Sequence, residues 1–104
     1  MKSLKNKIDF DALYKKGIKR KIPIGTAINT PGEELKLGIV INRTIGNAVK
    51  RNRIKRIIRE TVRKHSVKAS IVLIINRKDI NTNEISHIIN NYFNIINNDK
   101  QSNN

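Results

Sequence analysis

The sequence contains no cysteine and no tryptophan, and it has only two prolines and eight acidic residues. Without cysteine the chain cannot form disulfide bonds, thiolate zinc sites or iron–sulfur clusters, and it has no thiol nucleophile. A disulfide-stapled secreted fold is therefore excluded, and the reducing cytoplasm is the expected location.

Long apolar stretches are also missing. No run approaches the roughly 18 residues that cross a membrane, and residues 1–10 lack the apolar stretch of a signal peptide. We therefore expect a protein that neither enters a membrane nor leaves the compartment in which it is made.

Residues that could build a catalytic or metal site are few. His65 and His87 fall in different predicted elements, with no cysteine or carboxylate at metal-ligand spacing. Asp9 and Asp11 are two positions apart on a predicted helix, so their side chains point in different directions. We expect this chain to have no catalytic residue, no metal site, no bound cofactor and no small-molecule substrate.

Positive charge, in contrast, is abundant. The chain has 22 Lys and Arg residues against 8 Asp and Glu, which gives a formal net charge of +14 in 11.9 kDa. The segment from Lys50 to Lys64 alone holds eight cations and one acid, Glu60. Such an excess indicates a polyanionic partner, nucleic acid above all. Hydrophobic residues make up 38% of the chain, enough for one core, so residues 1–104 are expected to form a single domain.

The hydrophobic pattern predicts an α/β fold, built as an α+β two-layer sandwich in the order αβββαβα. The predicted elements are a helix within 6–17, two weaker strands within 19–30 with a turn at 29–32, a strand at 35–41, a helix at 47–65, a strand at 71–75 and a helix at 81–96. A polar, flexible tail is expected over 97–104. By the general rule for parallel strands, the central strand–helix–strand crossover would be right-handed.

The predicted helix at 47–65 has one apolar side and one basic side. Ile54 and Ile58 recur on the first, and Arg56 and Arg59 project from the second. Like charges four residues apart destabilise a helix by about 0.2–0.5 kcal/mol per pair. Binding to phosphates would neutralise these charges and would explain why so many cations lie on one side of the helix. A solvated basic face is the alternative interpretation, although solvated helices usually mix both signs of charge.

An aromatic pair lies on the first predicted helix. Phe10 and Tyr14 are four residues apart, beside Leu13, and such a pair most often packs into a core. If the two rings were exposed, they could stack on the bases of a single strand, which contributes about 1–3 kcal/mol per base. The residues alone leave both interpretations open.

The segment 45–60, which reads Ile-Gly-Asn-Ala-Val-Lys-Arg-Asn-Arg-Ile-Lys-Arg-Ile-Ile-Arg-Glu, resembles the signature of the bacterial ribonuclease P protein subunit. The hallmark of that family is an Arg-Asn-Arg run on a basic helix, which is 51–53 in this chain. The resemblance extends back through the strand around Leu37 to the helix at 10–17, and forward to 71–75. It therefore covers most of the chain.

The resemblance implies a protein that binds a large catalytic RNA, the ribonuclease P RNA. Protein and RNA would act together as an endoribonuclease that removes the 5′ leader from precursor tRNA. The RNA would carry the catalytic groups and Mg²⁺, and the protein alone would bind neither metal nor cofactor. By analogy, the residues that contact the RNA subunit or the region near the cleavage site are Lys50, Arg51, Asn52, Arg53, Lys55, Arg56, Arg59 and Arg63.

The family also holds the single-stranded leader in a cleft between its first helix and its sheet. The matching positions in this chain are Phe10, Tyr14, Lys36, Val40 and Asn42. Family members often carry serine where this chain has Val40 and Asn42, and a basic residue where it has Thr44. The family fold further implies a left-handed crossover, contrary to the general rule.

Two other classes of protein share part of this pattern. A small ribosomal RNA-binding protein would have the same size, charge and lack of catalytic groups, and it would sediment with ribosomal subunits. A DNA-binding regulator would need paired short helices and usually a dimer interface, whereas here the basic helix is flanked by strands.

Overall fold

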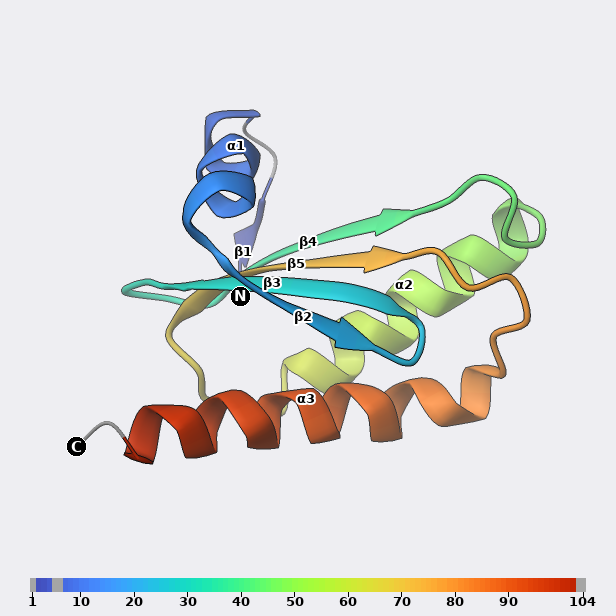
Figure 1. The fold of residues 1–104 in the computed structure, drawn as a ribbon. Helices are drawn as coiled ribbons and strands as arrows, with labels where there is room; N and C mark the ends of the chain where they lie inside the picture. The colour runs from blue at the N-terminus through green and yellow to red at the C-terminus, as the bar shows by residue number, and fades with distance from the viewer. Residues whose placement is uncertain (1, 5–6, 103–104) are drawn as a thin grey trace.

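Within residues 2–4 and 7–102, which this computed structural model describes, the chain forms one five-stranded mixed sheet and three helices (Figure 1). Side-chain surroundings are described at 3–4 and 10–97. The elements in chain order are β1 (Lys2–Ser3), α1 (Lys7–Lys16), β2 (Ile18–Ile22), β3 (Gly25–Pro31), β4 (Lys36–Ile41), α2 (Ala48–Val62), β5 (Ala69–Ile75) and α3 (Thr82–Ser102).

The strands follow the order β1-β4-β5-β3-β2 across the sheet. β4 and β5 are parallel and are connected through α2, whereas β3 is antiparallel to both of its neighbours, β5 and β2. The α/β class is confirmed, and the elements follow αβββαβα once the two-residue strand β1, which pairs with β4, is set aside. The left-handed sense of the crossover stays a prediction.

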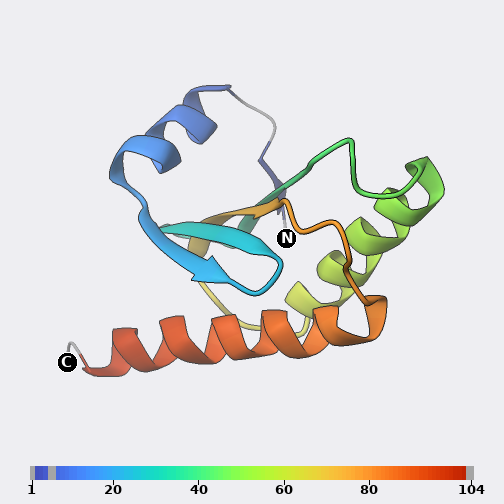
Figure 2. The same cartoon turned by 45° about the vertical axis from the view of Figure 1, so that its right-hand side comes forward.

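The two faces of the sheet are covered by different helices (Figure 2). Side chains alternate along β5, so Ile71, Leu73 and Ile75 belong to the main hydrophobic core, which they share with α2 and α3. Val72 belongs to a smaller cluster under α1, and Ile74 packs against that cluster. The sheet and the α2–α3 layer form the expected sandwich, and α1 covers part of the opposite face.

Helix α3 is held to the sheet by burial of its apolar side chains and by a partly buried hydrogen bond. Tyr92 and Phe93 are both almost fully buried in the main core. The Tyr92 hydroxyl donates a hydrogen bond to the side-chain oxygen of Asn29 in β3, at 3.1 Å. Burial raises the pKa of Tyr92, so the neutral hydroxyl persists as the donor at physiological pH.

The turn predicted at 29–32 is wrong. β3 continues through Pro31, and within it Asn29 and Thr30 pair with Ile71 and Ser70 of β5. The β2–β3 hairpin instead turns between Ile22 and Gly25. Pairing with a strand more than forty residues away satisfies the backbone of this segment and overrides its turn-forming composition.

Helix α3 extends further than the sequence predicts. Most of the tail expected at 97–104 is helical, because α3 continues to Ser102, and 103–104 lie outside the described residues. Glycine and proline commonly end helices, and neither occurs after Gly46, so neither interrupts α3. None of the described helices, α3 included, combines the length and apolar character needed to cross a membrane.

Candidate nucleic-acid interface

Helix α2 begins at a defined cap. The Asn47 side chain accepts a hydrogen bond from the Lys50 amide at 2.9 Å, which satisfies one of the free N–H groups of the first turn. Gly46 precedes the cap with φ of +56°, a left-handed conformation that other residues adopt at a cost. The first turn of α2 holds no acidic residue. The positive end of the helix dipole therefore favours an external anion here.

The outer face of α2 carries most of the residues predicted to bind RNA. The exposed members are Asn52, Arg53, Arg56, Arg59 and Arg63, and the half-buried members are Lys50, Arg51 and Lys55. Val49, Asn52, Arg53 and Arg56 line a shallow hollow of ≈ 500 Å³ on this face. A guanidinium group can bind two phosphate oxygens at once, so the face is suited to a nucleic-acid backbone.

Arg51 has a structural role that the sequence did not indicate. Its Nη1 atom donates to the carbonyl oxygens of Gly46 at 2.9 Å, Arg43 at 3.1 Å and Ile45 at 3.5 Å. These bonds tie the start of α2 to the loop at 42–46, which connects it to β4. The first arginine of the Arg-Asn-Arg run therefore positions this loop, in addition to any contact that it makes with RNA.

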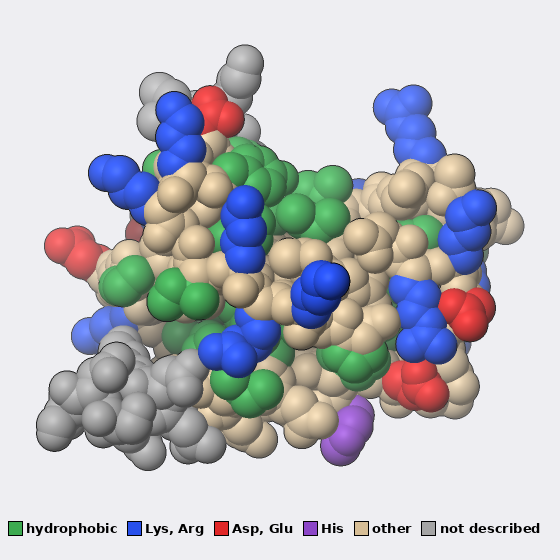
Figure 3. Space-filling model, in the orientation of Figure 1, with side chains coloured by type: hydrophobic (Ala, Val, Ile, Leu, Met, Phe, Trp, Pro, Cys, Tyr) green, Lys and Arg blue, Asp and Glu red, His purple; other side chains and the backbone are tan. Residues whose placement is uncertain are grey.

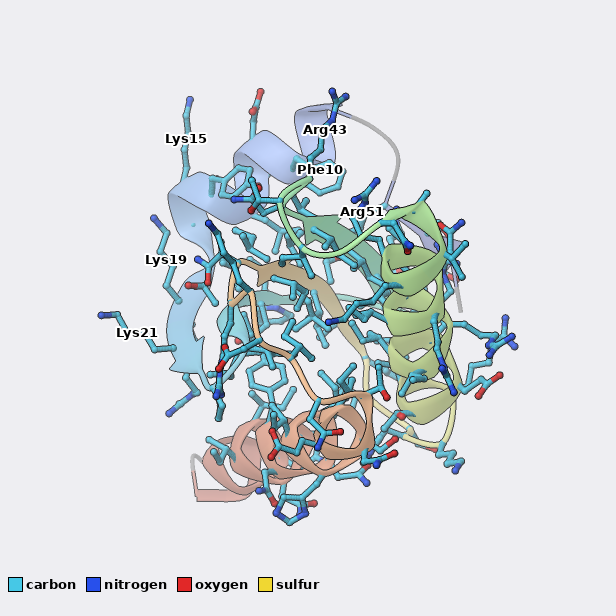
Figure 4. All side chains as sticks on the ribbon, turned by 90° about the vertical axis from the view of Figure 1, so that its right-hand side faces the viewer. Phe10, Lys15, Lys19, Lys21, Arg43 and Arg51 are labelled. Carbon is cyan, nitrogen blue, oxygen red and sulfur yellow. The ribbon has the colours of Figure 1, made fainter. Side chains whose placement is uncertain are left out.

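The loop at 42–46 also orders itself. The Asn42 side-chain oxygen accepts hydrogen bonds from the Thr44 amide and from the Thr44 hydroxyl, both at 3.0 Å. Figure 4 shows Arg43 extending from this loop toward the side of the sheet that α1 covers. Arg43 is exposed, and it is a candidate RNA contact that the sequence analysis missed because it lies outside the basic helix.

The two aromatic residues of α1 lie in different environments. The Phe10 ring lies over Gly38 of β4, where an added Cβ would be 2.9 Å from the ring, and it packs against the small cluster that includes Leu13. Tyr14 is 40% exposed, with its ring centroid 6.5 Å from that of Phe10. Phe10 thus fits the core interpretation in part, whereas Tyr14 offers a ring to a ligand.

Beside α1, the sheet presents a row of side chains that no described helix covers. Val40, Ile74, Thr26 and Lys21 are successive cross-strand partners on β4, β5, β3 and β2, and we refer to them as the open row. Val40 is two residues from Gly38, so the open row is on the same face as Phe10. Figure 3 shows a hollow with hydrophobic side chains on this face, between α1 and the end of β4.

Lys36 is separated from the other residues predicted to bind the leader. Lys36, Gly38 and Val40 point to the same face of β4, and Phe10 occupies the middle position. Lys36 therefore lies on one side of the Phe10 contact, and Val40 and Asn42 lie on the other. A strand placed in the open row would contact Val40 and Asn42 but would not reach Lys36 without crossing under α1.

The titratable residues do not converge on one point. Among the residues that the structure describes, no three of the His, Asp and Glu side chains lie close enough to hold a metal ion. His65 stacks on Phe93 with ring centroids 4.4 Å apart and pairs with the Asn90 side chain at 2.7 Å. The described surface can thus bind phosphates and bases, but it presents no assembled acid–base site.

The comparison of this chain with known proteins identifies a family. Residues 1–98 match the sequence model of the family described as Ribonuclease P. The chain is 40% identical over 91 residues to the ribonuclease P protein component of Macrococcus caseolyticus, spanning 80% of this chain and 79% of that protein. It is 41% identical over 90 residues to the ribonuclease P protein component of Staphylococcus epidermidis, spanning 79% and 78%.

The fold agrees with this assignment. The structure of the Staphylococcus aureus RNase P protein superposes with a TM-score of 0.81 and 30% identity, and the match spans 92% of this chain and 95% of that chain. The chain therefore belongs to the ribonuclease P protein family, as its segment 45–60 predicts.

Proposed function

We propose that this protein is the protein subunit of ribonuclease P and assists the ribonuclease P RNA in removing the 5′ leader of precursor tRNA. Family membership and the basic face of α2 both support this function. The observation that carries the proposal is the loop at 42–46, held by Arg51, because it joins the open row directly to the start of α2. One RNA complex can therefore contact both surfaces at once.

The two surfaces have different chemistry and take different parts of that complex. The guanidinium groups on the outer face of α2 bind phosphates of the RNA subunit and of the region near the cleavage site. The surface beside α1 offers the Tyr14 ring and the apolar side chains of Val40 and Ile74. Such a surface accepts unstacked bases of a single strand, so it binds the leader, whatever its sequence.

The reacting groups belong to the RNA subunit in this proposal. Mg²⁺ held by that RNA activates the attacking water, and the protein supplies positive charge that lowers the repulsion between RNA subunit and substrate. The complex should then need less Mg²⁺ than the RNA subunit alone. Positioning and charge screening are the contributions that this chain's own residues can make.

Reconstitution tests the proposal. The full-length protein is mixed with its cognate ribonuclease P RNA and a precursor tRNA, and release of the leader is measured at low Mg²⁺. We expect the mixture to cleave where the RNA subunit alone does not. Lack of stimulation, together with binding to ribosomal RNA and sedimentation with ribosomal subunits, would instead identify a small ribosomal protein.

Replacing Tyr14 by alanine should weaken binding of precursor tRNA roughly tenfold and leave binding of mature tRNA unchanged. Loss of one stacked base accounts for this size of effect, near the lower end of the range for base–aromatic contacts. Only the precursor has a leader to lie beside α1, so only its dissociation constant should rise. Equilibrium binding of both tRNAs to the reconstituted complex measures the difference.

Ile95→Ala is the matched control, because Ile95 is also 40% exposed but lies on α3, which packs on the other face of the sheet. Phe10→Ala is a poorer probe, because Phe10 packs on Gly38 and its loss would weaken the packing of α1 on the sheet. If Tyr14→Ala weakened both tRNAs equally, or lowered the melting temperature instead, Tyr14 would be a packing residue.

A further inference from the structure

A second group of exposed cations lies away from α2. Lys15 is in the last turn of α1, and Lys19 and Lys21 lie on β2, and all three are exposed. Figure 4 shows them along one side of the molecule, pointing outward, with α2 on the opposite side. We refer to these three residues as the lysine strip.

The strand register places the lysine strip at the end of the open row. Lys21 pairs with Thr26 and is the last member of that row, and Lys19 pairs with Ile28, which belongs to the cluster under α1. Cross-strand partners share a face, so both lysines are on the α1 side of the sheet. Arg20, between them, faces the other layer, where its charge acts on Tyr92.

The local charge is one-sided. Residues 12–32 contain five cations and no acid, and the nearest acid before them is Asp11. Lysines on an edge strand often serve only to prevent pairing with another chain, and β2 is an edge strand of this sheet. That role explains Lys19 and Lys21, and the helix dipole favours Lys15 in the last turn of α1. Neither effect requires the three lysines to lie along one line.

We infer that the lysine strip binds phosphates of the leader nucleotides that lie farther from the cleavage site than those beside α1. The inference rests on the proposed function, because it requires the leader to follow the open row. That row crosses four strands, and three spacings of about 4.8 Å give a path of roughly 14 Å from Val40 to Lys21. A single-stranded leader that enters at the loop 42–46 and follows this path leaves the sheet over the lysine strip.

The chemistry of the strip fixes what it recognises. An ammonium group is a compact charge on a flexible stem, so it attracts phosphates without reading a base. The strip itself contains no ring on which a base could stack. Its contribution to binding should therefore depend on the length of the leader and on salt, and not on the leader's sequence.

The test compares two precursors in the reconstituted complex, with leaders of about four and about twelve nucleotides, a range typical of single-strand sites. The variant is K19Q/K21Q. The control is K68Q/K78Q, which removes the same charge from two exposed lysines that belong neither to the open row nor to the lysine strip. Wild type and control should bind the long-leader precursor more tightly than the short-leader precursor.

K19Q/K21Q should bind the long-leader precursor about tenfold more weakly than wild type, roughly threefold for each lysine. Its affinity for the short-leader precursor should be unchanged. Its salt dependence for the long leader should also flatten by about 1.4 log units per log unit, which corresponds to two contacts with a single strand.

Three outcomes would overturn the inference. Equal binding of the two precursors by wild type would show that no distal leader contact exists, while cleavage of the short-leader precursor would show that the proposed function still holds. Equal losses on both precursors, with weaker binding of the RNA subunit, would assign the strip to that RNA. If K19Q/K21Q still bound the long-leader precursor more tightly than the short one by the same factor as wild type, these lysines would serve only to protect the edge strand from pairing with another chain.

Discussion

Replacing Arg53 and Arg56 by alanine is expected to weaken binding to ribonuclease P RNA about a hundredfold at low salt. Both side chains are exposed on the outer face of α2 and line the same hollow. Charge-assisted hydrogen bonds between guanidinium and phosphate are the strong ones, so the loss of two should be large. The slope of log affinity against log salt should flatten by about 1.4 to 1.8, and binding over a salt series measures both effects.

The fold of this double variant should be unchanged. Exposed positions without special contacts alter the free energy of unfolding by about 0.5 kcal/mol or less, so circular dichroism and the melting temperature should match those of wild type. If the folded variant kept its full affinity for the RNA subunit, the outer face of α2 would not be part of the interface.

Arg51→Ala is expected to lower the stability of the fold, unlike R53A/R56A, which should lower only the affinity for RNA. The half-buried Arg51 donates to three loop carbonyls, and removing it leaves those groups without their partner. We expect a loss of about 1–3 kcal/mol in the free energy of unfolding, which R53A/R56A should not show. A pooled substitution of the whole Arg-Asn-Arg run would mix these two effects.

The basic helix could be predicted from the sequence because its pattern is local. A 3.6-residue period fixes which side of α2 meets the sheet, and burial of Ile54, Ile58 and Val62 follows from it. The outward position of Arg56 and Arg59 is then determined by geometry alone. The apolar period and the positions of the charged residues predict the same buried and exposed sides of α2. Both are read from this segment alone.

Features that depend on the packing of distant segments could not be predicted in this way. The separation of Lys36 from Val40 arises because Phe10, from another element, lies over Gly38 between them. The lysine strip forms only when α1 and β2 are placed together, and the open row requires the register of four strands. Residues on one face of a single helix could therefore be grouped from the sequence, whereas residues brought together by the packing of different elements could not.

The isolated protein is expected to release no leader from precursor tRNA. Several candidate general bases among its described residues are already engaged in other contacts. His65 stacks on Phe93, and His87 pairs with the Asn91 side chain at 3.2 Å. The hydrogen bond from Arg77 to Asp79, at 2.9 Å, lowers the pKa of that carboxyl and so makes it a weaker base.

The measurement uses protein freed of RNA and of contaminating nuclease, incubated with precursor tRNA and Mg²⁺. We expect no product from the protein alone, slow cleavage by the RNA subunit alone at high Mg²⁺, and cleavage by the two together at low Mg²⁺. Cleavage at the mature 5′ end by the protein alone would contradict this prediction. The active site would then have to be sought among the exposed carboxylates, such as those of Asp11 and Glu60.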